Sequence, residues 1–385
     1  MNDRRQPVAA VSRLLTRHFI WLLLGSYAVA AFRPAFGLAV RDVTFGEVTL
    51  FKERTKITLP MVMLAVLLLN AGLGVPPSRL KSSVRGSLVL AAGLTANLLI
   101  PIAFIFAVVP ATYFWLDPDE AQNLLLGLAL IASMPIAGSS AAWSQNTDGD
   151  LVLSLGLVVF STLLSPITTP LSLRSVGLMA AGDYAEDLRR LAGHGAGPFL
   201  TLCVTLPSLL GTFLSWAVGE NRVARARPHL KLLNSLNLLL LIYSNASICL
   251  PRAIAYPDID FLAVALGTAV SLCVIAFASG WWIARLLKLD PARRTSLMFG
   301  LGMNNNGTGL VLAALALSGH PRVMLPLITY NLVQHLAAGG VALLLGRSPA
   351  GQEAASAEPR AASVTEFRTA RVAAGSPFRH PERRT

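Results

Sequence analysis

The stretch Phe299-Gly-Leu-Gly-Met-Asn-Asn-Asn-Gly-Thr-Gly-Leu-Val-Leu312 lies inside an apolar segment long enough to cross a bilayer. Asparagine and glycine are poor helix formers, so a helix through this segment is predicted to break near Asn304–Asn306. Three consecutive side-chain amides are costly in hydrocarbon unless polar groups meet them. Irregular backbone at membrane depth is tolerated where it is buried in protein or lines a cavity, and such breaks mark binding sites in secondary transporters. The alternative interpretation is a glycine-rich kink packed against neighbouring helices.

The composition of the whole chain is that of a membrane protein. Of its 385 residues, 54% are hydrophobic and 14% are charged, and long apolar runs recur along the sequence. The net charge of +12 could indicate a nucleic-acid partner, but the basic residues lie between the apolar runs and at the chain ends. Because that placement is typical of helix flanks facing anionic lipid, the expected partner is the lipid bilayer and not nucleic acid. The cysteines lie in apolar runs without metal-ligand spacing and are interpreted as core residues: Cys203, Cys249 and Cys273.

The apolar runs predict an all-α polytopic membrane protein with ten transmembrane helices. The fourth span is predicted to break at Pro135–Ser140, because proline removes a backbone donor and Gly138 adds conformational freedom. The ninth span contains the opening stretch. The predicted spans are His18–Val40, Ile57–Val75, Gly86–Val109, a fourth from Gln122 to the polar turn Ser144–Asp150, Leu151–Leu173, Pro198–Val218, Leu232–Leu250, Phe261–Leu287, the ninth, and Val323–Leu345.

A long polar stretch, Arg174–Gly195, separates five spans from five, and its Tyr184–Leu191 part is a candidate interfacial helix. The fourth span of each set is the broken one. Because five is odd, the two sets would face opposite ways, as in an inverted repeat. The predicted parts are a cytoplasmic basic leader (1–17), the first five-helix repeat (18–173), an extracytoplasmic linker (174–195), the second repeat (196–346) and a disordered cytoplasmic tail (347–385).

The positions of the basic residues predict the orientation. Lysine and arginine are concentrated in the leader and in the links after spans two, six and eight, which places both termini in the cytoplasm of a cell (inner) membrane protein. The link after span one opposes this trend. The first span is expected to be a retained helix, because the apolar stretch continues past Arg33-Pro34; the alternative is a signal peptide cleaved near Ala28-Val29-Ala30.

Several local motifs, in order, resemble the bile acid:sodium symporter family over residues 18–346. They are Pro135–Ser140, Gly149-Asp-Leu-Val-Leu-Ser154, Ser161-Thr-Leu-Leu-Ser-Pro166, Gly302-Met-Asn-Asn305 and Tyr330-Asn-Leu-Val-Gln334. The resemblance implies secondary active transport of a small organic anion, bile acid-like with a carboxylate or sulfonate, by alternating access. It also implies that a panel domain rocks against a core domain, in which the two broken helices cross and sodium and the anion bind.

The positions that would hold sodium depart from the family pattern. The resemblance places the family's acidic residue of the ninth span at Gly300, an asparagine of the fourth at Ala141 and a threonine of the fifth at Val158. The glutamine of the third span falls near Ala96, beside Asn97, and that of the ninth-span break becomes Asn304. Sodium needs several oxygen ligands, usually with a carboxylate. Sodium coupling is therefore not carried over, although sodium remains the one cation that the resemblance implies; no organic cofactor is expected.

The broken helices themselves favour an anion site. The starts of their second halves offer free N–H groups and positive dipole ends, with no carboxylate nearby. The helix-break residues are Pro135, Gly138, Gly302 and Gly307. The candidate substrate-binding residues are Ser139, Ser140, Asn304, Asn305, Asn306 and Thr308, and the candidate ion or coupling residues are Ser140, Ser154, Asn304 and His335, with no metal site expected.

Each candidate has a structural alternative. The serines could bond back to their own helix, and His335, which titrates near physiological pH, could couple protons or bridge two helices. Arg33 is interpreted as a snorkelling residue near a kinked helix end, and Tyr243–Ser247 as an interhelical hydrogen-bonding cluster. An enzyme is not expected, since no nucleophile–base pair or metal-ligand set lies within the spans. A channel and a non-transporting membrane sensor remain the rival classes.

Overall fold

The computed structural model describes residues 11, 14–15, 18–50, 53–75, 87–114 and 116–345. Most of the predicted leader, the basic link with Arg79, Lys81 and Arg85, and the predicted tail lie outside the described residues. Clustering of backbone contacts assigns Met1–Val341 to one compact unit, and the second unit, Ala342–Thr385, contains only the end of the last helix among the described residues.

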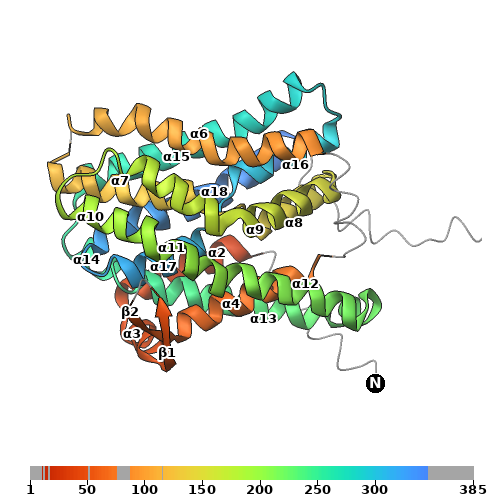
Figure 1. Ribbon diagram of the computed structural model, residues 1–385, viewed down its shortest axis with the longest axis horizontal. Helices are drawn as coiled ribbons and strands as arrows, with labels where there is room; N and C mark the ends of the chain where they lie inside the picture. Colours follow the sequence, from red (N-terminus) through yellow and green to blue (C-terminus); the bar gives the residue numbers. More distant parts are fainter. Residues whose placement is uncertain are drawn as a thin grey trace, which may run out of the picture. The chain divides into compact units, whose positions relative to one another are not determined.

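The described chain is predominantly helical (Figure 1). Its longer helices are α2 (Phe19–Phe32), α3 (Ala35–Asp42), α4 (Leu59–Leu73), α6 (Ser87–Thr112), α7 (Pro118–Ser133), α8 (Gly138–Asn146), α9 (Leu151–Val176), α10 (Gly182–Arg190), α12 (Leu206–Val218), α13 (Glu220–Ala246), α15 (Ile259–Leu286), α16 (Pro291–Gly302), α17 (Asn306–Ala316) and α18 (Met324–Leu344). Shorter elements are η2 (Leu191–Gly195), α11 (Ala196–Leu200), η3 (Thr201–Thr205), α14 (Leu250–Ala255) and η4 (Pro321–Val323).

Length and apolar composition identify this as a multi-pass membrane protein. Among the described residues, five helical runs are long and apolar enough to cross a bilayer, or six when the bent pair α2–α3 is one span. Two shorter apolar helices, α4 and α17, accompany them. The five long runs, which match the third, fifth, sixth, eighth and tenth predicted spans, are Leu88–Ala111, Leu151–Val176, Gly182–Val218, Ile259–Leu286 and Pro321–Leu344.

A small β-hairpin corrects the all-α prediction. Strands β1 (Thr44–Leu50) and β2 (Glu53–Thr58) pair antiparallel directly before α4. Each segment contains two threonines and one valine or isoleucine, residues that favour strands. Most of the hairpin falls in the link predicted between the first and second spans, where no apolar run marks it.

The first predicted span bends by 91° between α2 and α3 at Arg33–Pro34, where proline restricts the preceding residue and the sequence predicts a kinked helix end. Two predicted boundaries differ from the structure. The basic segment before the seventh span is not a loop, because α13 begins at Glu220 and carries it as helix. In the predicted linker only residues 177–181 are non-helical, and the helical run that begins at Gly182 continues through η2, α11 and η3 into α12.

The helices pack in two neighbourhoods within the larger unit. In one, α4 packs against α12 and α13, and α2 packs against α13 and α14 (Figure 1). Gly72 and Gly211 allow α4 and α12 to approach closely, because a Cβ on either would meet the backbone of the other helix. In the other, α6 packs against α7, α9 and α15, and α16 packs against α8, α9 and α15. Helix α17 contacts α4, α13 and α7, so it lies where the two neighbourhoods meet.

Candidate functional site

Both predicted helix breaks are confirmed. Helix α7 ends at Ser133 and α8 begins at Gly138, while α16 ends at Gly302 and α17 begins at Asn306. The extended residues between the halves form an isolated antiparallel β-bridge, Ile136 with Asn304. The N–H of Ala137 donates to the carbonyl of Met303 (2.9 Å), and the N–H of Asn305 donates to the carbonyl of Pro135 (2.8 Å). Each break thus satisfies the backbone groups of the other, as burial in an apolar bundle requires.

Helix α9 supports the first break. The last carbonyls of α7 lose their intrahelical partners because the helix stops. The Thr169 hydroxyl donates to the carbonyl of Ser133, and the Ile136 N–H donates to the Ser161 hydroxyl (3.1 Å). Sequence reasoning missed Thr169 as part of the site, since a threonine inside an apolar helix is usually bonded to its own helix.

Helix α18 supports the second break through Gln334. The Gln334 side chain accepts from the Asn304 N–H (3.0 Å) and donates to the Asn304 carbonyl (3.2 Å), so it pairs with the backbone as a second strand would. The Asn304 amide donates to the carbonyl of Ile131 at the end of α7 (3.0 Å). Asn304 therefore holds the two breaks together, which is a structural role beside the binding role predicted for it.

The other predicted substrate residues surround this paired region. Asn305 is the N-cap of α17, with its side chain accepting from the Thr308 N–H (3.4 Å). Asn306 is 1% exposed, and neither of its amide atoms has a hydrogen-bond partner among the described residues. The buried hydroxyls of Ser140 and Thr308 are likewise without partners there, so Ser140 does not make the back-bond to its own helix that was the alternative for the serines. Buried polar atoms that lack a partner in the protein are available to form hydrogen bonds with a ligand.

The exposed part of the site is formed by the helix starts. Ser139, Asn305 and Gly307 are partly exposed and Gly138 is exposed. A Cβ on Gly138 or Gly307 would make only ordinary van der Waals contact, the nearest atoms being Ala71 Cβ (3.9 Å) and Asn305 Oδ1 (3.6 Å). These glycines are therefore placed where a ligand could approach the first N–H groups of α8 and α17.

Three of the positions that would hold sodium in the family, Gly300, Ala141 and Val158, are apolar here. Ala141 and Val158 belong to one buried hydrophobic cluster with Leu153, Leu157 and Ile136. A Cβ on Gly300 would lie 2.9 Å from Leu157 Cδ1, so the leucine covers the place of the family's carboxylate. Asn97 keeps one buried side-chain oxygen without a partner in the described part of the chain. This side of the breaks offers no set of oxygen ligands from those positions.

The predicted coupling residues Ser154 and His335 lie in other surroundings. The Ser154 hydroxyl donates to the Ser144 hydroxyl (2.8 Å), which is also 2.9 Å from that of Ser296, and the three serines join α8, α9 and α16. His335 is buried in α18, and its ring packs edge-on against Phe19 of α2 with 5.6 Å between centroids. This contact joins two helices, as the structural alternative for His335 requires.

Two further interpretations from the sequence can be compared with the structure. The Tyr243–Ser247 cluster is an interhelical hydrogen-bonding site, as predicted: the Tyr243 hydroxyl donates to the Arg33 carbonyl (2.6 Å) and accepts from the Gly37 N–H (3.1 Å), and Arg41 donates to Asn245 (2.6 Å). The Arg33 side chain is exposed at the bend between α2 and α3, in agreement with a snorkelling role.

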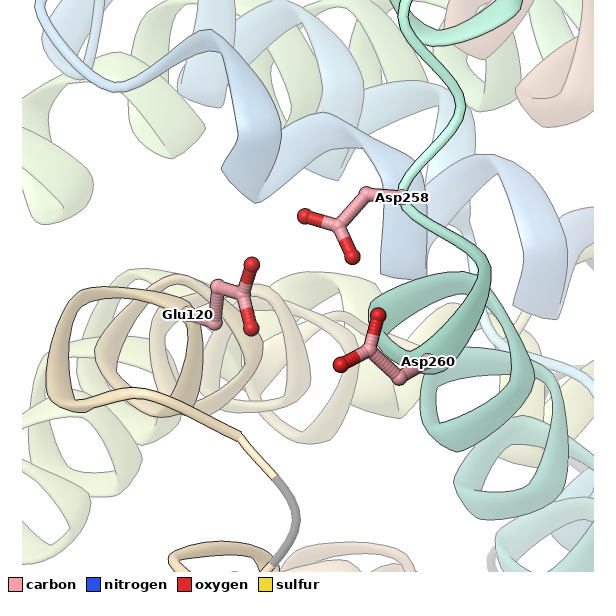
Figure 2. A group of neighbouring side chains, drawn as sticks. All are labelled: Glu120, Asp258 and Asp260. Atoms are coloured by element: carbon pink, nitrogen blue, oxygen red, sulfur yellow. The ribbon is translucent and has the colours of Figure 1, made fainter.

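Sequence reasoning missed an acidic cluster, because its members are distant in the chain. Figure 2 shows Glu120 on α7, Asp260 on α15 and Asp258 just before α15 with their carboxylates turned toward one another. Ligand oxygens of the three lie within 4.8 Å of one another. Arg322, in η4, is 3.4 Å from Glu120 and 3.3 Å from Asp258. The group could coordinate a cation, but the guanidinium of Arg322 already supplies a positive charge there.

The cluster lies before the apolar part of α7, and its charge is pH-sensitive. A hydrogen bond with Asp258, burial, and repulsion by the Asp258 and Asp117 carboxylates raise the pKa of Glu120 to about 7. The same hydrogen bond lowers the pKa of Asp258. The pair therefore shares one proton, which stays on Glu120 until near neutral pH.

Because the pKa of Glu120 is raised in the folded protein, we expect the free energy of unfolding to fall as pH rises. Between the ordinary pKa of Glu120 and about 7, the folded state binds more protons than the unfolded state, so the free energy of unfolding falls across that window. Asp258 contributes in the opposite direction, but only at lower pH. Melting temperatures of the detergent-solubilised protein at pH 5 to 8 should fall for the wild type and fall less for Glu120→Gln, which keeps a hydrogen-bond donor. Parallel curves for the two proteins would contradict this.

The fold and the site together define a multi-pass membrane protein whose polar site is built from two interrupted, paired helices. Residues 61–250 match the family described as the Sodium Bile acid symporter family. The matched part of the chain belongs to that family, in agreement with the sequence motifs, and the family is one of membrane transporters.

Similar proteins come from bacteria and mammals. A Bacillus subtilis (strain 168) protein described as uncharacterized protein YbaS is 27% identical over 223 residues, which is 58% of this chain and 69% of that protein. Sodium/bile acid cotransporter 4 of Mus musculus is 30% identical over 250 residues, or 63% of this chain and 52% of its own length, and the Rattus norvegicus protein of the same name gives the same values. The chain thus spans about half the length of these mammalian relatives.

Proposed function

We propose that this protein is a secondary active transporter that moves a small organic anion, with a carboxylate or sulfonate group, across the membrane by alternating access. Family membership and the names of the mammalian relatives support a transported anion of this class. The architecture proposed for it is ten transmembrane segments in two inverted five-helix repeats, 18–173 and 196–346, each with its fourth segment broken. The proposal includes no enzymatic activity.

The single observation that carries the proposal is the pairing of the two breaks with unpartnered polar groups around them. The bridge between Ile136 and Asn304 brings the starts of α8 and α17 to one place. Both starts present the positive end of a helix dipole. The buried amide of Asn306 and the hydroxyls of Ser140 and Thr308 supply hydrogen bonds for an anionic head group. Ser139 and Asn305 are partly exposed beside them and would make the first contacts with the anion.

The coupling ion is proposed not to be sodium at the positions used by the family. Ala141 and Val158 pack in a hydrophobic cluster, and Leu157 covers Gly300, so a hydrated or partly hydrated cation would lack ligands there. The alternatives are an uncoupled carrier and proton coupling through His335, which lies in the helix that carries Gln334. Backbone carbonyls and the Asn304–Asn306 run would have to form any sodium site that does exist.

Uptake into proteoliposomes tests both parts of the proposal. Purified protein is reconstituted, and uptake of a panel of labelled organic anions is measured with sodium and pH gradients imposed separately. Saturable uptake that is unchanged when choline replaces sodium supports the proposal. A steep, saturable sodium dependence contradicts the proposed coupling. Non-saturating flux with a measurable conductance would identify a channel instead, and binding without uptake would identify a sensor.

The orientation proposed for the chain is a cell (inner) membrane protein with both termini in the cytoplasm and the 174–195 linker outside. A single cysteine introduced at Asp183 should be labelled by a membrane-impermeant maleimide in intact cells, whereas one introduced at Ala354 should be labelled only after the membrane is opened. The native Cys203, Cys249 and Cys273 are buried, which limits background labelling. Equal labelling of both positions from outside would contradict the inverted-repeat arrangement.

A further inference from the structure

A chain of buried hydrogen bonds runs from the first apolar helix to the paired breaks. The Asn331 amide of α18 donates to the hydroxyl of Tyr27 in α2 (2.9 Å). Gln334 donates to Asn331 Oδ1 (3.3 Å) and also pairs with both backbone groups of Asn304. All four residues are buried, with no more than 7% of any of them exposed. Because these residues are buried, solvent cannot easily replace a hydrogen bond that is lost from this series.

The two ends of this chain lie in different packing neighbourhoods. Tyr27 belongs to α2, which packs against α13 and α14. Asn304 follows α16, which packs against α8, α9 and α15. The link through α18 is thus a polar connection between a helix of one neighbourhood and the break in the other. A displacement of α2 relative to α18 would remove the acceptor from the Asn331 amide.

We propose that Tyr27 is a positioning residue that couples the placement of α2 to the geometry of the second helix break. With its hydroxyl in place, Asn331 is oriented so that its oxygen accepts from Gln334, and Gln334 is oriented to hold the extended backbone at Asn304. That backbone is the one that pairs with Ile136 and starts α17. Its functional consequence rests on the proposed anion site, but the coupling itself does not.

Hydrogen exchange of the second break tests the coupling without a substrate. In Tyr27→Phe the ring is retained and the hydroxyl is lost, so the backbone N–H of Asn304 should open more often. Exchange in peptides that cover 299–306 of the full-length protein is expected to rise by about three- to ten-fold, the equivalent of one lost net hydrogen bond. The matched control is Tyr243→Phe, which also removes a buried hydroxyl bonded to the first span, but one whose hydrogen bonds go to Arg33 and Gly37 and not to the residues of the break. That control should leave these peptides unchanged.

A second variant removes the same link from the other side. Asn331→Leu should raise exchange in the same peptides, and the double variant Tyr27→Phe/Asn331→Leu should exchange no faster than Asn331→Leu alone, because both changes break one chain. Unchanged exchange at 299–306 in both single variants, or equal increases in Tyr243→Phe, would overturn the proposal.

Uptake kinetics then separate the coupling from the proposed function. If the anion binds at the paired breaks, Tyr27→Phe should raise KM for a transported anion with little change in melting temperature relative to Tyr243→Phe. Faster exchange together with an unchanged KM would support the coupling and count against the breaks as the anion site. The two proposals can therefore fail separately.

Discussion

Replacing Asn306 with alanine is expected to raise the apparent KM for the transported anion by roughly ten- to hundred-fold, while the protein still reaches the membrane. The Asn306 side chain is buried at the start of α17, and its amide atoms make no bond to the residues that the structure describes. Its removal therefore costs the fold little. A hydrogen bond from it to a charged ligand would contribute up to about 3 kcal/mol, and each 1.4 kcal/mol corresponds to about a factor of ten in affinity.

Substitutions at the neighbouring residues should differ from Asn306→Ala in their effects on stability and on KM. Asn304→Ala removes the bond to the Ile131 carbonyl and is expected to lower the melting temperature as well as affinity. Asn305→Ala removes an N-cap, at a cost to stability of about 1 kcal/mol. Thr308→Val removes one uncharged hydroxyl and should have a smaller effect on KM than Asn306→Ala.

The control for Asn306→Ala is another asparagine within the helices. Asn237 of α13 donates to the carbonyl of Met63 in α4 (2.8 Å), so Asn237→Ala removes an interhelical bond far along the chain from the breaks. KM should be unchanged in this variant even where stability falls. Wild-type KM and rate in Asn306→Ala, measured with an identified substrate, would show that the binding site is elsewhere and that the asparagines only pack a kink.

A carboxylate restored at Gly300 is expected to destabilise the protein severely rather than to create a sodium site. In Gly300→Glu the side chain would enter the space of Leu157, within a cluster that contains Ala141 and Val158. An uncompensated charge buried in this way costs about 3–5 kcal/mol. Expression and melting temperature of the purified variant, with and without sodium, are the measurements.

The matched control is Gly300→Ala. Its Cβ meets only the end of the flexible Leu157 side chain, so a small shift of that side chain should accommodate it with a mild loss of stability. The pair of variants separates the effect of size from the effect of charge. A folded Gly300→Glu protein that gains sodium-dependent uptake, or a melting temperature that sodium raises, would mean that the cluster can rearrange into a ligand set.

Much of the fold could be predicted from the sequence because its signals are local. Long apolar runs identify the membrane class, and five of them are long apolar helices in the structure. Both breaks were located to within a few residues, since Pro135 and Asn304–Asn306 disfavour helix whatever surrounds them. The interhelical role of Tyr243–Ser247 was also predictable, because polar groups in apolar helices need partners. Pro34 marked a kink but not its 91° angle, and the hairpin and the helical continuation of basic segments carried no such signal.

The sequence by itself determined where helices stop and which polar residues lie at membrane depth. Only the tertiary structure decided what those residues do. Gln334 forms hydrogen bonds with the backbone of Asn304, and Tyr27 accepts a hydrogen bond from Asn331, which is distant in the sequence. Glu120 lies beside Asp258 and Arg322. Helix propensity is a property of neighbouring residues, whereas a hydrogen bond or an ion pair depends on which distant helix lies alongside. The hydrogen bonds that Asn304 makes across the breaks, and the lack of any described partner for the Asn306 amide, therefore appeared only when the two breaks were seen to pair.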